Sequence, residues 1–226
     1  MKILRTPDEQ FENLPGYDFE PHYTTIKVDD GAELRIHHID EGDPSNEPLL
    51  LMHGNPSWSY LHRHMIPGLV DTGKRVIAVD LVGCGRSDKP ASRDDYTLQR
   101  HYDWMEQWLL ANELENITLF CQDWGGTIGL YLASILPDRF DRVIVANSGL
   151  PHGEGNELMD KWQSMMGMVT EFPFEMVLRQ AFQPAISDEE YAGYLAPFPS
   201  PEYQAGICKF PLLIATNPNN PGVPIN

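Results

Sequence analysis

The sequence has 226 residues, of which 42% are hydrophobic and 10% aromatic, which suits one folded domain and excludes intrinsic disorder from lack of apolar content. Its 33 acidic and 16 basic residues give a net charge of −17, which disfavours binding to nucleic acid or to an anionic membrane. Its cysteines have neither disulfide-framework nor zinc-ligand spacing: Cys84, Cys121 and Cys208. Because neither a signal peptide nor a membrane-spanning stretch is apparent, we expect a soluble cytoplasmic protein.

Six short runs rich in β-branched and apolar residues predict strands, at 24–28, 33–39, 48–52, 75–79, 117–121 and 142–146. The first two flank Asp29-Asp30-Gly31, which is typical of a hairpin turn. The run at 48–52 is continuously apolar, as in a strand buried on both faces, and the run at 75–79 also predicts a buried strand. Helical spacing predicts helices at 60–71, 99–111 and 126–136, so strands and helices alternate.

The pattern changes after the sixth predicted strand. Residues 156–226 contain helical segments, many Met and Pro, and no convincing buried strand. We therefore expect an α/β core in residues 1–150, with a mostly parallel sheet opened by a hairpin, and a helical cap in residues 151–226. Five methionines would give this cap an adaptable apolar face: Met159, Met165, Met166, Met168 and Met176.

The segment 117–126, Ile-Thr-Leu-Phe-Cys-Gln-Asp-Trp-Gly-Gly, predicts a strand that turns sharply into a helix with Asp123 at the apex. Glycines after the apex allow the tight bend of a nucleophile elbow, which lifts one side chain above the sheet. A carboxylate near a helix N-terminus is favoured in its ionised form, so Asp123 is a candidate nucleophile. Helix capping is the competing interpretation for an isolated Asp at this position.

A second segment favours the catalytic interpretation. Residues 49–56, Leu-Leu-Leu-Met-His-Gly-Asn-Pro, place a His-Gly turn after the third predicted strand, where α/β-hydrolases build half of their oxyanion hole. The expected donors are the backbone N–H groups of Asn55 and Trp124. The glycines in 80–87 have no following Gly-Lys-Ser/Thr, so we expect a turn organised by Asp80 rather than a phosphate-binding loop.

Three blocks together resemble the haloalkane dehalogenases: His-Gly-Asn-Pro-Ser-Trp-Ser-Tyr-Leu at 53–61, Val-Asp-Leu-Val-Gly-Cys-Gly-Arg-Ser-Asp-Lys-Pro at 79–90, and Cys-Gln-Asp-Trp-Gly-Gly at 121–126. The opening Leu-Arg-Thr-Pro-Asp-Glu-Gln-Phe and the later Ala-Pro-Phe-Pro at 196–199 are similar to one branch of that family. The resemblance implies an α/β-hydrolase fold and hydrolysis of a haloalkane to an alcohol and a halide ion. It implies no metal and no organic cofactor.

The same resemblance implies roles for individual residues. Asp123 would attack the halogen-bearing carbon and form an alkyl ester, and Trp124 would bind the leaving halide through its indole N–H. The second halide donor is Asn55 in some branches. In another branch it is a cap tryptophan, for which Trp162 lies in the corresponding place. The N-terminal and cap similarities favour Trp162, although ordinary cap packing explains this residue equally well.

Hydrolysis of the ester needs a histidine base and an acid, and here the sequence departs from the family. None of the eight histidines has the family's position; His152 is the only one expected near the mouth of the cap. Ala-Asn-Ser at 146–148 offers no carboxylate after the sixth strand. We therefore expect a C-terminally truncated hydrolase, in which the last strands and helices of the core, with the acid and the base, lie beyond residue 226.

Two alternatives remain open at this point. An epoxide hydrolase shares the fold and the Asp nucleophile and uses two cap tyrosines, for which Tyr191, Tyr194 and Tyr203 are available. A hydrolase-fold protein that only binds a ligand would explain the lack of a recognisable base.

Overall fold

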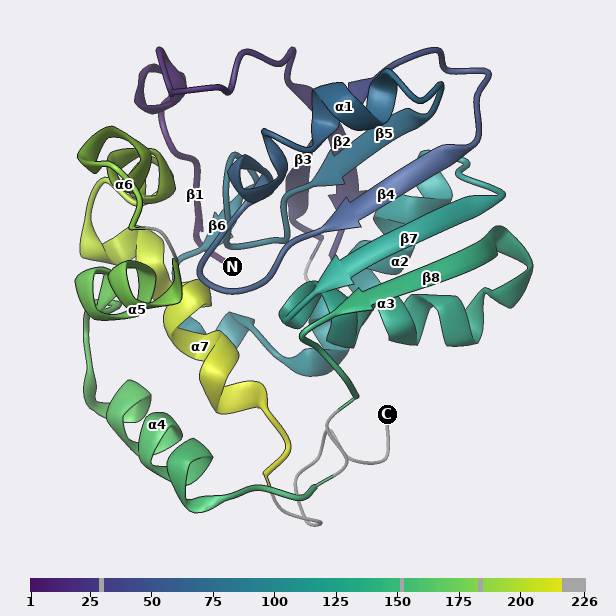
Figure 1. Cartoon of the computed structure of the whole chain (residues 1–226). Coiled ribbons are helices and arrows are strands. Elements are labelled where there is room, and N and C mark those ends of the chain that lie inside the picture. The colour runs from purple at the N-terminus through teal and green to yellow at the C-terminus, as the bar shows by residue number, and fades with distance from the viewer. Residues whose placement is uncertain (29–30, 151–152, 183–184, 217–226) are drawn as a thin grey trace.

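The computed structural model describes residues 1–28, 31–150, 153–182 and 185–216. Its centre is a six-stranded sheet in the order β2-β3-β5-β4-β7-β8 (Figure 1). The bounds are β2 (His22–Lys27), β3 (Glu33–Glu41), β4 (Pro48–Met52), β5 (Arg75–Val79), β7 (Ile117–Gln122) and β8 (Phe140–Ala146). β2 pairs with β3 and β3 with β5 in antiparallel fashion, and the remaining pairs are parallel. All six predicted strands and the mixed pairing are confirmed.

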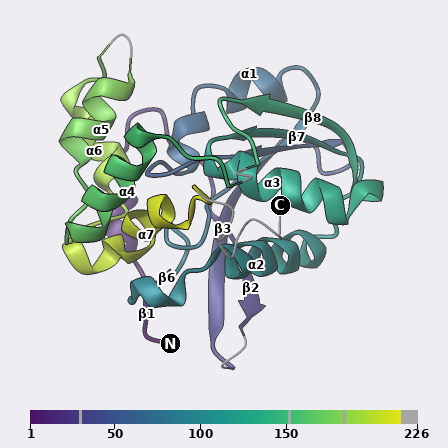
Figure 2. The same cartoon turned by 90° about the horizontal axis from the view of Figure 1, so that it is seen from below.

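Helices cover both faces of this sheet. Figure 2 shows α1 (Ile66–Val70) on one face and α2 (Leu98–Ala111) with α3 (Trp124–Ile135) on the other. The central strands β4 and β5 are almost entirely buried, as their continuous apolar runs predicted. Of the predicted hairpin turn, Asp29 and Asp30 lie outside the described residues, while Gly31 N–H donates to the carbonyl of Val28 at 2.9 Å.

The single helix predicted at 60–71 is wrong. The chain forms a short 3₁₀ turn at Ser59–His62 and then the separate five-residue helix α1. Pro67 lies in the first turn of α1, where its missing backbone N–H costs nothing, whereas inside one continuous helix it would remove a hydrogen bond.

Four helices follow β8 and gather beside the sheet rather than on its faces (Figure 1). They are α4 (Glu157–Met168), α5 (Phe174–Ala181), α6 (Asp188–Leu195) and α7 (Ala205–Leu213). The five methionines of this region do not share one face: Met166 is fully buried, whereas Met168 is 79% exposed. None of the helices in the described part of the chain is long and apolar enough to cross a membrane.

Residues 2–6, which we call the N-terminal strap, join this helical layer to the core. β1 (Ile3–Leu4) pairs with β6 (Lys89–Pro90), two short strands that the sequence did not predict. Arg5 forms a bidentate ion pair with the buried Asp88, with both N–O distances at 2.8 Å. Thr6 Oγ1 donates to the carbonyl of Pro197 at 2.7 Å, just beyond α6.

Candidate active site

The elbow between β7 and α3 has the backbone geometry that the sequence predicted. Asp123 adopts φ 51° and ψ −123°, a strained conformation for a residue with a side chain. Gly125 is required beside it because a Cβ atom there would collide with the backbone carbonyls at the end of β4, those of Met52 and His53. The strain and the close approach together lift the Asp123 side chain away from its own helix. Within the described chain, that side chain makes no capping hydrogen bond to α3, so helix capping does not explain this Asp.

Backbone N–H groups lie around the Asp123 carboxylate. The N–H of Asn55 donates to Oδ1 at 2.9 Å. Burial raises the pKa of Asp123, and the backbone N–H groups of Asn55 and Trp124 and the nearby His53 oppose that effect without cancelling it. The expectation that the helix terminus would favour the ionised form is therefore outweighed by desolvation. Because Oδ1 is engaged by Asn55, Oδ2 is the better-placed nucleophilic oxygen.

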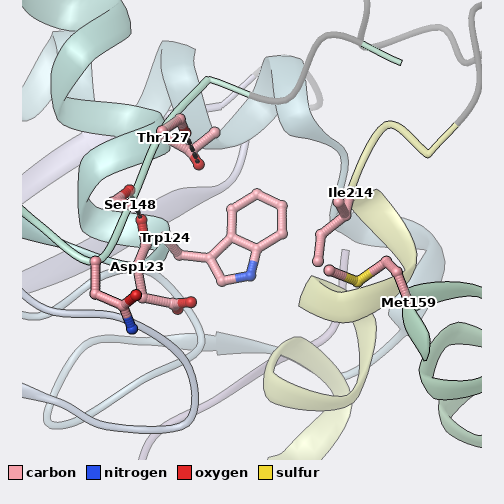
Figure 3. Close-up of a pocket in the computed structure, with 8 residues that line it drawn as sticks. Asp123, Trp124, Thr127, Ser148, Met159 and Ile214 are labelled. Carbon is pink, nitrogen blue, oxygen red and sulfur yellow. Dashed lines mark hydrogen bonds between the residues drawn. The ribbon is translucent and has the colours of Figure 1, made fainter. Parts of the chain in front are cut away.

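The Asp123 carboxylate opens into a cavity of about 210 Å³. Figure 3 shows the Trp124 indole between Asp123 and Ile214, with Met159 of α4 on the far side. The remaining lining residues come from α3 and from the turn after β8: Thr127, Asn147, Ser148 and Gly149. The cavity is thus built from the elbow, the end of a neighbouring parallel strand and two helices of the layer beside the sheet.

Ser148 lies in the site, although the sequence did not predict it as a site residue. Its hydroxyl donates to the Asp123 carbonyl at 2.5 Å, which ties the turn after β8 to the apex of the elbow. The order of the strands could have predicted this contact. The carboxyl ends of neighbouring parallel strands lie at the same edge of a sheet, and β8 neighbours β7.

The structure brings Asn55, Asp123 and Trp124 together and places Trp162 apart from them. Trp124 is 5% exposed, and its ring centroid lies 5.0 Å from that of Phe210 in α7. Trp162 lines a neighbouring apolar pocket of about 330 Å³ together with Asn156, Leu158 and Met159. Met159 lines both cavities, so the two adjoin.

The described histidines lie outside the cavity at Asp123. His53 lies closest to Asp123, but its Nδ1 faces the Gly54 carbonyl at 2.8 Å and its Nε2 accepts the Leu81 N–H at 3.0 Å. It is therefore a neutral imidazole whose basic nitrogen is already used, and burial lowers its pKa. His152 lies outside the described residues. Within the described part of the chain, no histidine lines the cavity at Asp123.

The loop after β5 is organised by Asp80, as predicted. This fully buried carboxylate accepts hydrogen bonds from the backbone N–H groups of Ser59 at 2.7 Å and Arg86 at 2.9 Å, and from Nδ1 of His37 at 2.7 Å. Gly85 passes so close to it that no side chain fits there. Among the described residues, no cluster of three or more His, Cys, Asp or Glu side chains is arranged to hold a metal ion.

Comparison with known proteins shows the family to which the chain belongs. Residues 47–181 match the family model described as alpha/beta hydrolase fold. A haloalkane dehalogenase of Psychrobacter cryohalolentis is 49% identical over 223 residues, which are 98% of this chain and 74% of that protein. One of Mycolicibacterium paratuberculosis is 43% identical over all of this chain and 76% of its own length. The chain belongs to the haloalkane dehalogenase family.

Solved structures agree with this assignment. The haloalkane dehalogenase DpaA of Paraglaciecola agarilytica superposes with a TM-score of 0.92 at 38% identity, covering 100% of this chain and 76% of that one. The haloalkane dehalogenase DatA of Agrobacterium tumefaciens gives a TM-score of 0.72 at 27% identity, over 93% of this chain and 74% of that one. The present chain thus spans about three quarters of the length of these haloalkane dehalogenases.

Proposed function

We propose that this chain cleaves the carbon–halogen bond of haloalkanes, with Asp123 as the nucleophile. Oδ2 of Asp123 would form a bond to the halogen-bearing carbon while the carbon–halogen bond breaks and the halide leaves with its electron pair. The product would be an alkyl ester on Asp123. The observation that carries the proposal is the lifted, strained Asp123, which accepts the Asn55 N–H and lines a cavity of about 210 Å³.

The departing halide needs donors in a site with little water. Trp124 fits this role because its indole N–H can only donate and its ring forms a wall of the cavity. We propose Asn55 as the second donor, since its backbone already contacts the nucleophile and its side-chain amide lies beside α7. Neither Asn55 nor Trp162 lines the cavity of Asp123: Trp162 lines the adjoining pocket, and Asn55 is preferred only because its backbone bonds to the nucleophile.

Release of the alcohol would follow when water attacks the ester carbonyl, which regenerates the Asp123 carboxylate. The backbone N–H of Asn55 faces Oδ1, the oxygen that would carry negative charge in that step. The step needs a general base, and the described histidines do not supply one at this cavity. We therefore propose that the described residues support alkylation of Asp123, whereas the base for ester hydrolysis is not among them.

Neither alternative gains support from the structure. Tyr191, Tyr194 and Tyr203, the tyrosines considered for epoxide opening, are not among the residues that line the cavity. Tyr194 is buried against Tyr60, with ring centroids 5.1 Å apart. A protein that only binds ligands would not need a strained carboxylate at the base of its cavity.

The test is incubation with 1-bromobutane, followed by intact-mass spectrometry and bromide quantification. The chain should gain one butyl group at Asp123 and release bromide. Asp123→Ala should abolish both signals, whereas Asp138→Ala, which alters an exposed acid just beyond α3, should leave them unchanged. Alkylation or bromide release by Asp123→Ala at the wild-type rate would refute the assignment.

We also infer a cytoplasmic location, because all three cysteines are free and buried rather than paired in disulfides. The net charge of −17 supports a small uncharged substrate and a halide product rather than a nucleic acid partner.

A further inference from the structure

The side chain of Gln163 in α4 holds the end of α7 through hydrogen bonds at both ends of its amide. Its Nε2 donates to the carbonyls of Pro211 and Ile214, each at 2.9 Å, and its Oε1 accepts the hydroxyl of Thr216 at 3.2 Å. The last carbonyls of a helix lack partners within that helix, and α7 ends at Leu213. Gln163 therefore supplies donors that a further turn of α7 would have supplied, and it fixes the chain from Pro211 to Thr216 against α4.

Met159 lies one helical turn before Gln163. Side chains four residues apart in a helix are neighbours on one face, so Met159 and Gln163 share a face of α4. Met159 and Ile214 both line the cavity at Asp123, and Figure 3 shows their side chains together, on the far side of the Trp124 indole. Gln163 belongs to the helix of Met159 and is bonded to the backbone of Ile214. It therefore sets the spacing between these two apolar residues.

Met159 and Ile214 separate the cavity at Asp123 from further space. Both also line a second cavity of about 260 Å³, between the chain that precedes α4 and the chain that follows α7. Met159 in addition lines the apolar pocket of about 330 Å³ beside Trp162. Room for an alkyl chain thus continues beyond this pair of side chains, and access to it depends on how far apart the two are held.

The opposite end of α4 is fixed independently of Gln163. Arg93, in the chain between β6 and α2, donates to the carbonyls of Met166 at 3.3 Å and Val169 at 2.5 Å, at the C-terminal end of α4. The helix is therefore held near its middle by Gln163 and at its end by Arg93. Loss of the Gln163 amide would leave α4 attached to the core while the chain after α7 is released.

We propose that Gln163 is a positioning residue for substrate specificity, which limits the length of the reacting alkyl chain by fixing the opening between Met159 and Ile214. A short chain whose halogen-bearing carbon lies at Asp123 ends before this opening, whereas a longer chain must pass through it. The Met159 side chain is unbranched and adaptable, but Ile214 is stiff at χ1, so the spacing of the two backbones decides the width. This inference rests on the proposed function, in which Asp123 attacks a haloalkane.

The test compares the initial rates of bromide release from 1-bromobutane and from 1-bromohexane. A methylene group that fits poorly in an apolar pocket costs roughly tenfold, so the wild type should react with bromobutane about tenfold faster. Gln163→Leu keeps a side chain of similar size without the hydrogen bonds, and should lower this ratio to about threefold or less. Gln107→Leu is the matched control, because Gln107 donates to a carbonyl of its own helix α2, and should keep the wild-type ratio.

Two further variants test the route of the effect. Met159→Ala removes one side of the opening directly and should lower the ratio by itself. In the Met159→Ala background, Gln163→Leu should have almost no further effect, because the opening that it controls is already lost. Thr216→Val keeps the shape of that side chain but removes the hydroxyl bonded to Gln163, so it should lower the ratio in the same direction by a smaller factor. This variant decides the question if Gln163→Leu does not fold.

The outcomes separate this inference from the proposed function. No bromide release by the wild type, or release by Asp123→Ala at the wild-type rate, would overturn the proposed function and this inference with it. Where release depends on Asp123, an equal rate with both bromoalkanes in the wild type would overturn this inference alone. So would an unchanged ratio in Gln163→Leu, or in Thr216→Val where it stands in. Equal losses of rate with both bromoalkanes would also overturn it, because they indicate general loosening of the fold.

Discussion

Replacing Asp80 with Asn tests how the core holds the loops on either side of the site. Burial acts to raise the pKa of Asp80, but attraction to His37 and its hydrogen bonds outweigh burial and lower the pKa from 3.8 to about 2. That displacement corresponds to about 2 kcal/mol of stability held by the charged form. Asn also turns an N–H toward donors that need an acceptor, so we expect a loss of about 2–4 kcal/mol in the free energy of unfolding at neutral pH.

Urea unfolding of the wild type and of Asp80→Asn at several pH values measures this loss. An acid whose pKa is depressed by folding contributes stability above its unfolded pKa and loses that contribution as the pH falls through the folded value. The difference in the free energy of unfolding between the two proteins should therefore be largest at neutral pH and shrink between about pH 5 and pH 2. Asp18→Asn, which alters an exposed acid outside the helices and strands, is the control and should match the wild type. A difference in unfolding free energy below about 1 kcal/mol at neutral pH, or one that grows in acid, would refute the reasoning.

Three further predictions concern the site itself. Trp124→Phe keeps an aromatic ring but removes the donor, so bromide binding should weaken by on the order of 1–3 kcal/mol in a fluorescence titration, while Trp162→Phe should bind bromide as the wild type does. Burial raises the pKa of Asp123, and an acid with a raised folded pKa destabilises the fold at pH values above its unfolded pKa. Asp123→Asn should therefore melt at a higher temperature than the wild type at neutral pH, with the difference vanishing in acid. Gly125→Ala should lose about 1–3 kcal/mol of stability and most alkylation in the bromobutane assay, because its methyl group displaces the elbow backbone; a folded, active variant would contradict the close approach seen there.

Local sequence patterns predicted the sheet well because its strands are defined by burial. The apolar runs that became β4, β5 and β7 are buried on both faces, so each run had only one way to fit a hydrolase-like sheet. The elbow could be recognised for a similar reason, since a strand, an acidic apex and paired glycines lie within ten residues. The two-residue strands β1 and β6 escaped prediction because so few residues carry no periodicity.

Features that depend on distant partners could not be predicted. The hydrogen bond between Asn55 and Ile207 joins residues 152 apart, and no local sequence pattern around either residue predicts it. The place of Trp162 depends on how α4 packs, and the sequence left it undecided between halide donor and packing residue. The raised pKa of Asp123 could not be predicted for the same reason. The sequence showed that Asp123 lies at a helix terminus, which lowers the pKa, but not that it is buried, which raises the pKa by more.

The N-terminal strap has a consequence for how the helical layer can move. Arg5 of the strap forms an ion pair with Asp88 in the loop after β5, and Thr6 donates a hydrogen bond to the carbonyl of Pro197 beyond α6. The strap thus anchors the chain just beyond α6 to the core at one point. Movement of this part of the helical layer away from the sheet would first have to break the hydrogen bond between Thr6 and Pro197.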